Sequence, residues 1–201
     1  MAVSLGCSGQ QGLLNMVDRS LARSDKPERE FQKRQDRTRF YSGSQVIQVE
    51  QPRDRRDTRS ATISATAYCD GEIEEDYECY PSDVYLRLYV SYLDESRYTY
   101  QLRGAQSVSV VVMQGDEAAE GNYQLTAYEP STSYEAPNVY LTSETLRWTM
   151  DPVDFVVFAL ADEAYIQIGQ NYLDMRYDRG RLTTMAEDYF GPVLDELRTG
   201  N

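Results

Sequence analysis

The sequence contains no histidine, and this absence excludes several familiar kinds of site. Ser-His-Asp and Cys-His catalysis, histidine acid–base chemistry and His-ligated zinc all require an imidazole. No Gly-x-Gly pattern occurs, which excludes a glycine-rich phosphate loop. No run approaches the length of a membrane-spanning helix, so the sequence predicts none. Carboxylate chemistry remains available for catalysis, but no pair among the 33 acidic residues is singled out by its context.

Basic residues are also few, and they are unevenly placed. The formal net charge is -13, from 20 Lys and Arg against 33 Asp and Glu. Residues 1–60 hold 12 basic and 8 acidic residues, a balance of +4, whereas residues 61–201 hold 8 and 25, a balance of -17. An acidic body repels nucleic acid and anionic lipid headgroups. We therefore expect no nucleic-acid partner.

Leu5-Gly6-Cys7, followed by Ser8-Gly9, is the most specific motif in the chain. It resembles the end of a bacterial lipoprotein signal peptide, in which the cysteine receives lipid and becomes the mature N-terminus. The charged and fully apolar regions of such signals are missing from the sequence. The resemblance implies that residues 1–6 are a signal remnant and that Cys7 anchors the chain to a membrane. It also implies a place in the bacterial cell envelope, either periplasmic or exposed at the surface. The alternative is an ordinary cytosolic N-terminus.

Cysteine usage fits this reading, because the chain has 3 cysteines. If Cys7 carries lipid, Cys69 and Cys79 remain as a pair that closes a ring of 11 residues. A disulfide here would stabilise the fold by about 3 kcal/mol in the chain-entropy model and would require an oxidising compartment. A metal site is the alternative, but two cysteines without histidine or a further cysteine make a poor zinc set.

The ring between these cysteines is acidic. Its carboxylates include Asp70, Glu72, Glu74, Glu75 and Asp76. Carboxylate oxygens are ligands that Ca²⁺ prefers, but their spacing does not match an EF-hand loop. We interpret them as solvent-exposed side chains, expect no cofactor, and keep Ca²⁺ as the alternative.

The clearest strand lies at residues 83–93, where apolar and polar side chains alternate. Val84, Leu86, Leu88 and Val90 point to one face, and Tyr85 and Arg87 to the other, as a half-buried strand requires. Further strands are expected at 44–50, 60–68, 98–102, 107–113 and 123–128, with loops at 114–121 and 130–137. Short strands separated by turn signals predict an antiparallel sandwich or a barrel-like sheet.

The last third of the sequence adds helices, which makes the expected fold class α+β. An extended segment at 138–149 precedes Asp151-Pro152, an N-cap and N1 pair that predicts a short helix at 151–161. A hairpin is expected at 164–168 and 172–177, then a helix at 183–198 that Gly191-Pro192 should bend or break. This portion is similar to the C-terminal parts of many secreted bacterial domains of unknown function.

The segment before the strands carries few large apolar residues. A helix start is expected near Asp25-Lys26-Pro27-Glu28, and only Phe31 and Phe40 are large and apolar in the residues that follow. Because so little apolar surface cannot compensate the entropy of ordering, residues 7–40 are predicted to be a flexible tether. Residues 41–199 are then predicted to form a single globular domain.

Together these features favour a non-catalytic, lipid-anchored protein of the cell envelope with a binding, structural or adaptor role. The 17 tyrosines suit contact with a protein or glycan partner, although tyrosine is also common in strands for packing reasons. One alternative is a carboxylate-dependent hydrolase of envelope glycans, which would need two carboxylates about 5–9.5 Å apart in a cleft. The other is a cytosolic interaction protein without lipid.

Overall fold

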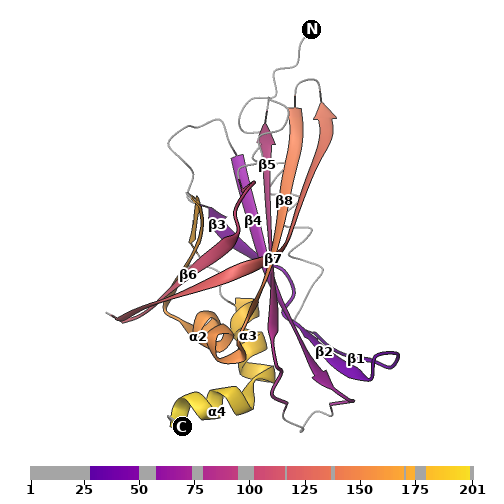
Figure 1. Ribbon diagram of the computed structural model, residues 1–201, viewed down its shortest axis with the longest axis vertical. Coiled ribbons are helices and arrows are strands. Elements are labelled where there is room, and N and C mark those ends of the chain that lie inside the picture. The colour runs from indigo at the N-terminus through magenta and orange to yellow at the C-terminus, as the bar shows by residue number, and fades with distance from the viewer. Residues whose placement is uncertain are drawn as a thin grey trace.

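The computed structural model describes residues 28–49, 58–73, 79–94, 102–115, 117–136, 139–169, 171–174 and 180–199. Within these ranges the chain forms ten strands and three helices (Figure 1). The strands are β1 (Glu28–Gln32), β2 (Arg37–Tyr41), β3 (Gln45–Val49), β4 (Thr58–Asp70), β5 (Val84–Asp94), β6 (Ser107–Gln114), β7 (Glu117–Ala136), β8 (Val139–Met150), β9 (Glu163–Ile168) and β10 (Asn171–Asp174). The helices are α2 (Pro152–Leu160), α3 (Gly180–Tyr189) and α4 (Gly191–Thr199). The expected α+β class, with a mainly antiparallel sheet, is confirmed.

The strands pair as two sheets that share β3 and β7. In one sheet β5 lies between β4 and β8, while β4 pairs along its other edge with β3 and β2. In the other, β6 and β9 lie between the first half of β7 and β10. The second half of β7 pairs with β8, and the end of β3 pairs with β10. Both strands therefore have neighbours in each sheet, and the long β7 bends from one sheet into the other (Figure 1).

The core lies on the inner faces of these sheets. Val84, Leu86, Leu88 and Val90 are at most 5% exposed, whereas Tyr85 is 47% exposed, which confirms the predicted alternation. The register places Leu86 opposite Trp148, and antiparallel neighbours directly opposite each other share a face. Each fully buried side chain of this size contributes about 1.5–3 kcal/mol of transfer free energy.

The helices cover one end of the molecule, at the bottom of Figure 1. The Asp151 carboxylate accepts a 2.8 Å hydrogen bond from the Val153 N–H, and Pro152 follows it, so the expected helix start is confirmed. The expected C-terminal helix is interrupted at Phe190 and continues as α4, as Gly191-Pro192 predicted. The first N–H groups of α3 are bound by Gln45 of β3, whose Oε1 accepts from the N–H groups of residues 181 and 182. This contact ties α3 to the sheet.

The predicted tether is wrong for residues 28–40. Instead of a helix beginning at 25–28, these residues form β1 and most of β2, and β2 pairs with β4. Thr38 and Phe40 are buried, and the Phe40 ring lies 5.0 Å from that of Tyr189. The charged residues of β2 occupy its outer face, so one buried aromatic ring suffices to anchor the strand. Residues 7–27, the rest of the predicted tether, lie outside the described ranges.

Both loops expected around the middle of the chain are also wrong. Only a tight turn with Gly115 at φ 61° separates β6 from β7, and β7 continues through residues 130–136. Polar residues in this stretch face outward from a paired strand, which the sequence pattern alone does not distinguish from a loop. The hairpin of β9 and β10 is confirmed, with Gly169 at φ 59° in its turn. The strand expected at 98–102 lies outside the described ranges, apart from Leu102.

Candidate functional site

The two cysteines predicted to pair lie at disulfide distance. Cys69 belongs to β4 and Cys79 to the loop that precedes β5, with their Cα atoms 6.3 Å apart. Thr38 holds the start of the ring between them: its hydroxyl donates to the Gly71 carbonyl over 2.8 Å and accepts from the Ile73 N–H over 2.9 Å. The two described ends of the β4–β5 connection are therefore held, one by hydrogen bonds to Thr38 and both by the cysteine pair.

The acidic residues of this ring are described only in part. Asp70 and Glu72 are exposed, whereas Glu74, Glu75 and Asp76 lie outside the described ranges. Within the described part of the chain, no three Asp, Glu or Cys side chains gather as metal ligands would. The Ca²⁺ alternative stays untested, because three of its five candidate carboxylates are not described. Cys7, the predicted lipid attachment site, also lies outside the described residues.

A pocket of about 190 Å³ lies between α2 and the β6–β7 hairpin, and we name it the α2 pocket. Its walls are formed by Val110, Val112, Ala119, Glu120, Gly121, Tyr123, Asp154, Val157 and Phe158. The β6 and α2 side chains make the floor apolar, while the polar groups come from β7 and α2. The pocket thus combines apolar walls with a few polar groups, which is the usual composition of a small-ligand site.

Tyr123 and Asp154 form the polar centre of the α2 pocket. The Tyr123 hydroxyl donates to Asp154 Oδ2 over 2.9 Å. Gly121 makes room for this contact, since any Cβ at that position would collide with the Tyr123 ring and hydroxyl. Burial, followed by the hydrogen bond to Asp154 and the charges of Asp154 and Asp151, raises the pKa of Tyr123. The hydroxyl therefore remains a donor near neutral pH.

Two carboxylates, Glu120 and Asp154, line the α2 pocket. Both are exposed, and each already accepts a hydrogen bond: Glu120 from the Ser109 hydroxyl over 2.7 Å, and Asp154 from Tyr123. A catalytic general acid needs a raised pKa, which enzymes obtain by burying the carboxyl group. This arrangement suits binding of a hydrogen-bond donor or cation better than proton donation.

A second polar cluster, around Glu144, is closed to solvent. Its carboxyl group is fully buried on β8 and accepts from the Tyr92 hydroxyl over 3.1 Å, the Tyr128 hydroxyl over 2.7 Å and the Leu102 N–H over 3.0 Å. These contacts join β5, β7 and β8 to the segment before β6. Sequence reasoning missed Glu144, although it is in phase with the inward-facing Leu146. We assign this cluster a structural role.

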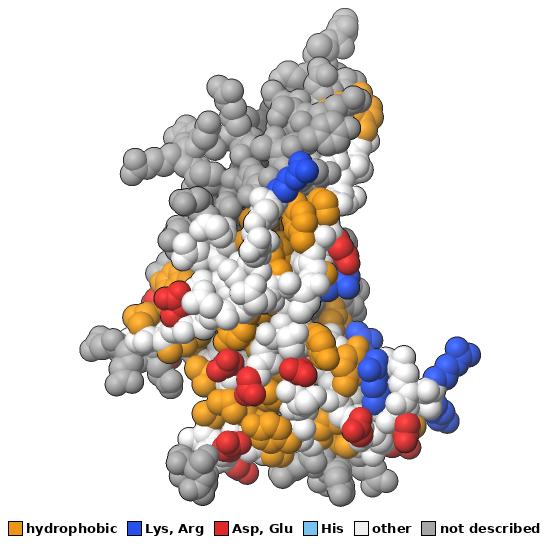
Figure 2. Space-filling view, in the orientation of Figure 1, with side chains coloured by type: hydrophobic (Ala, Val, Ile, Leu, Met, Phe, Trp, Pro, Cys, Tyr) orange, Lys and Arg blue, Asp and Glu red, His pale blue; other side chains and the backbone are white. Residues whose placement is uncertain are grey.

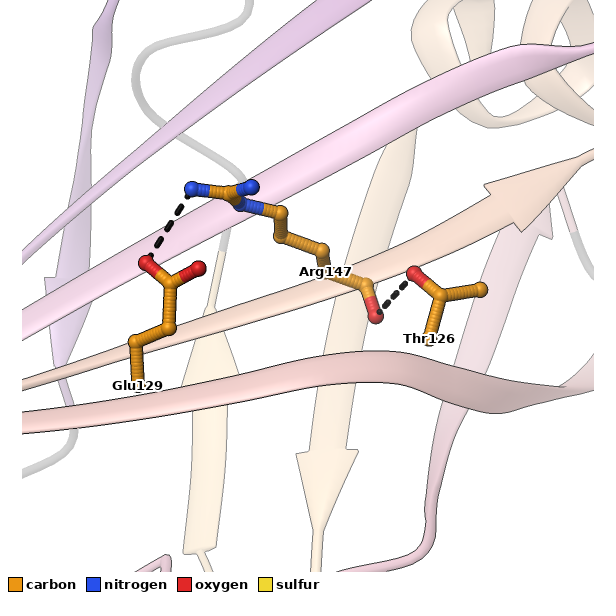
Figure 3. A network of polar contacts seen from close by, with 3 residues as sticks. All are labelled: Thr126, Glu129 and Arg147. Carbon is orange, nitrogen blue, oxygen red and sulfur yellow. Dashed lines mark hydrogen bonds and ion pairs between the residues drawn. The ribbon is translucent and has the colours of Figure 1, made fainter.

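A third polar feature is the Arg147 contact between β7 and β8 (Figure 3). The Arg147 guanidinium pairs with Glu129 over 3.1 Å, and its carbonyl oxygen accepts from the Thr126 hydroxyl over 3.1 Å. Thr126 is the residue at which the β7–β8 register shifts, so its hydroxyl bonds the backbone at a β-bulge. Arg147 is thereby held on the outer face of the sheet.

No helix in the described part of the chain is long and apolar enough to cross a membrane. Comparison of the chain with protein-family models, with curated proteins and with solved structures gives no match.

Proposed function

We propose that this chain is a non-catalytic, lipid-anchored protein of a bacterial cell envelope, held to the membrane through lipid on Cys7. The observation that carries the proposal is the pairing of Cys69 with Cys79, because disulfides persist in oxidising compartments such as the periplasm and the cell surface. The resemblance of Leu5-Gly6-Cys7 to a lipoprotein signal points to the same compartment independently.

The α2 pocket supports a binding role for the folded part. Its apolar walls suit the hydrophobic portion of a small ligand or of a partner side chain. Asp154 and Glu120 add negative charge at the opening, so the preferred ligand carries a hydrogen-bond donor or a positive charge. The exposed positions of both carboxylates favour recognition over acid–base catalysis.

The test of the anchor is lipid labelling in the native bacterial host. The chain, produced from its own gene with a C-terminal tag, should incorporate radiolabelled palmitate and sediment with membranes. Cys7→Ser should abolish both, while Ser8→Ala, a matched neighbouring change, should alter neither. A wild-type chain that takes up no label and stays in the soluble fraction would show that the anchor is absent.

The second candidate function is a carboxylate-dependent hydrolase of envelope glycans. One observation favours it, namely that Glu120 and Asp154 line the same pocket. If the pocket hydrolyses glycosidic bonds, purified protein should release reducing ends from envelope polysaccharide, and Glu120→Gln or Asp154→Asn should reduce the rate at least about 100-fold. Release at equal rates by wild type and both variants would assign the activity to a contaminant.

A further inference from the structure

The outer face of the β2–β4–β5–β8 sheet carries a continuous group of arginine and tyrosine side chains. We name it the Arg–Tyr face and define it as Arg37 on β2, Tyr68 on β4, Tyr85 and Arg87 on β5, and Arg147 on β8. The Arg37 guanidinium carbon lies 3.8 Å from the centroid of the Tyr68 ring. That ring in turn meets Tyr85 edge-on at 5.8 Å. The five side chains thus form one surface across four strands.

Two of these arginines stand directly opposite each other on neighbouring strands. Arg87 pairs in register with Arg147, and like charges in that position destabilise a sheet. Arg147 has Glu129 as its partner, as Figure 3 shows, but among the described residues no acidic side chain pairs with Arg87. In a chain of net charge -13, an exposed arginine without an acidic partner, set beside another arginine, is available to bind an external anion.

The remaining members of the face are pre-positioned. Arg37 is held by stacking on Tyr68 and by a 3.1 Å hydrogen bond from its Nε to Gln32 Oε1. Tyr85 is 47% exposed and presents its ring beside them. With three arginines against two carboxylates, Glu129 and the exposed Asp70 two residues after Tyr68, the face has a local balance of +1 (3 − 2) on an otherwise acidic molecule. Figure 2 shows basic side chains over β1 and β2, with acidic ones beside them and others over the helices.

We infer that the Arg–Tyr face binds an acidic polysaccharide, with sugar carboxylates on Arg37 and Arg87 and a sugar ring against Tyr85. Guanidinium groups bind carboxylates through paired hydrogen bonds, and a tyrosine ring offers an apolar surface with a polar tip. Thr38, next to Arg37, pairs with Cys69 on β4, whereas Arg87 pairs with Ser64, so the two arginines are offset along the strands as well as across them and lie roughly 20 Å apart. That separation suits a polymer with repeated charges better than one small anion. The Arg–Tyr face is separate from the α2 pocket, so this inference adds a second binding surface to the role proposed above.

The backbone of this sheet disfavours the other acidic polymer, a peptide. Extended peptides gain affinity by adding a strand at a sheet edge. Strands β4, β5 and β8 are each paired on both sides, so the face offers side chains and no backbone partners. Thr66 and Thr149, which flank Tyr85 in register, supply hydroxyl groups that donate and accept hydrogen bonds as sugar hydroxyls do. The surface therefore matches a polyhydroxylated chain.

The test is calorimetric titration of the full chain, with its disulfide intact, against three probes of equal length. These are an oligogalacturonate, a neutral oligogalactan and an oligoglutamate. We expect measurable binding of the oligogalacturonate, weakened at high salt, and no detectable binding of the neutral sugar. Arg87→Gln and Tyr85→Ala should each weaken oligogalacturonate binding at least about tenfold. Arg198→Gln, the same change on α4, which packs against α2 and α3, should have no effect.

Three outcomes would overturn the inference: equal binding of charged and neutral sugars, oligoglutamate bound as tightly as oligogalacturonate, or an Arg87→Gln variant that binds like wild type. Thermal unfolding of each variant shows whether it is folded, and Arg87→Gln changes only an exposed side chain. Since the titration uses purified protein, its result is independent of lipid labelling. A negative lipid-labelling result would therefore contradict only the proposed anchor, and a negative titration only the proposed polysaccharide site.

Discussion

Glu144 places a carboxyl group in the interior, where three donors converge on it. Replacing it with alanine leaves the Tyr92 and Tyr128 hydroxyls and the Leu102 N–H without this acceptor. A buried polar group left unsatisfied costs about 1–3 kcal/mol, so Glu144→Ala should lower the free energy of unfolding by about 3 kcal/mol. Urea unfolding at equilibrium measures this.

Glu187→Ala is the matched control, because Glu187 is exposed on α3. It should change the free energy of unfolding by no more than about 0.5 kcal/mol. Tyr128→Phe removes one donor and should cost about 1 kcal/mol. If Glu144→Ala were as stable as the control, the cluster would contribute nothing to the fold.

Tyr123 provides a prediction for alkaline pH. Its pKa is raised in the folded chain, first by burial and then by Asp154. The neutral hydroxyl thus stabilises the fold below the unfolded pKa of about 10, and this contribution is lost as pH rises through the folded pKa. The free energy of unfolding should therefore fall above about pH 10, and Tyr123→Phe should make that fall shallower.

Chemical unfolding from pH 8 to 11, with Cys7 alkylated to prevent thiol exchange, measures how steeply the free energy of unfolding falls with pH in wild type and in Tyr123→Phe. Tyr80 and Tyr189 also have raised pKa values, chiefly through burial, so part of the fall remains in the variant. Gly121→Ala, which would displace Tyr123, should reproduce the shallower slope. Identical slopes in wild type and Tyr123→Phe would refute the proposed coupling.

At the scale of elements, the β1–β2 hairpin decides where the folded part begins. Phe40 is 3% exposed and packs on Tyr189, whereas Phe31 is only partly buried. Truncating a buried phenylalanine costs about 3–5 kcal/mol. Phe40→Ala should therefore lower the free energy of unfolding by about 3 kcal/mol, and Phe31→Ala by clearly less. If both substitutions lowered the free energy of unfolding by the same small amount, residues 28–40 would behave as the tether that the sequence predicted.

At the scale of the whole molecule, net charge opposes folding. With 33 acidic and 20 basic residues, the compact state brings like charges together, and salt screens their repulsion. Raising NaCl from about 0.05 M to 0.5 M should raise the Tm by several degrees, since the screening length falls from more than 10 Å to less than 5 Å. Sucrose at matched osmolality controls for solvent exclusion. A Tm unchanged by NaCl would mean that local ion pairs dominate instead.

Part of the fold could be predicted from local pattern alone. The alternation at Val84–Val90 requires only that successive strand residues face opposite sides, and Asp151-Pro152 requires only helix-start geometry. The α2 pocket and the Arg–Tyr face could not be predicted in this way. Asp154 and Tyr123 are 31 residues apart in the sequence, and so are Arg37 and Tyr68. Both contacts therefore depend on the order in which the strands pair.

The sequence by itself determined the strand and helix periodicity, the cysteine count and the exclusion of histidine chemistry, because each is a property of residue identity and spacing. Only the tertiary structure decided that β1 and β2 join the sheet, that β7 bends between two sheets, and that Glu144 is buried. The physical reason is the same in each case. Polar side chains such as Thr38, Ser131 and Glu144 can occur in a loop, on the outer face of a sheet or in the core. Only pairing with strands that are distant in the sequence decides which of these environments each residue occupies.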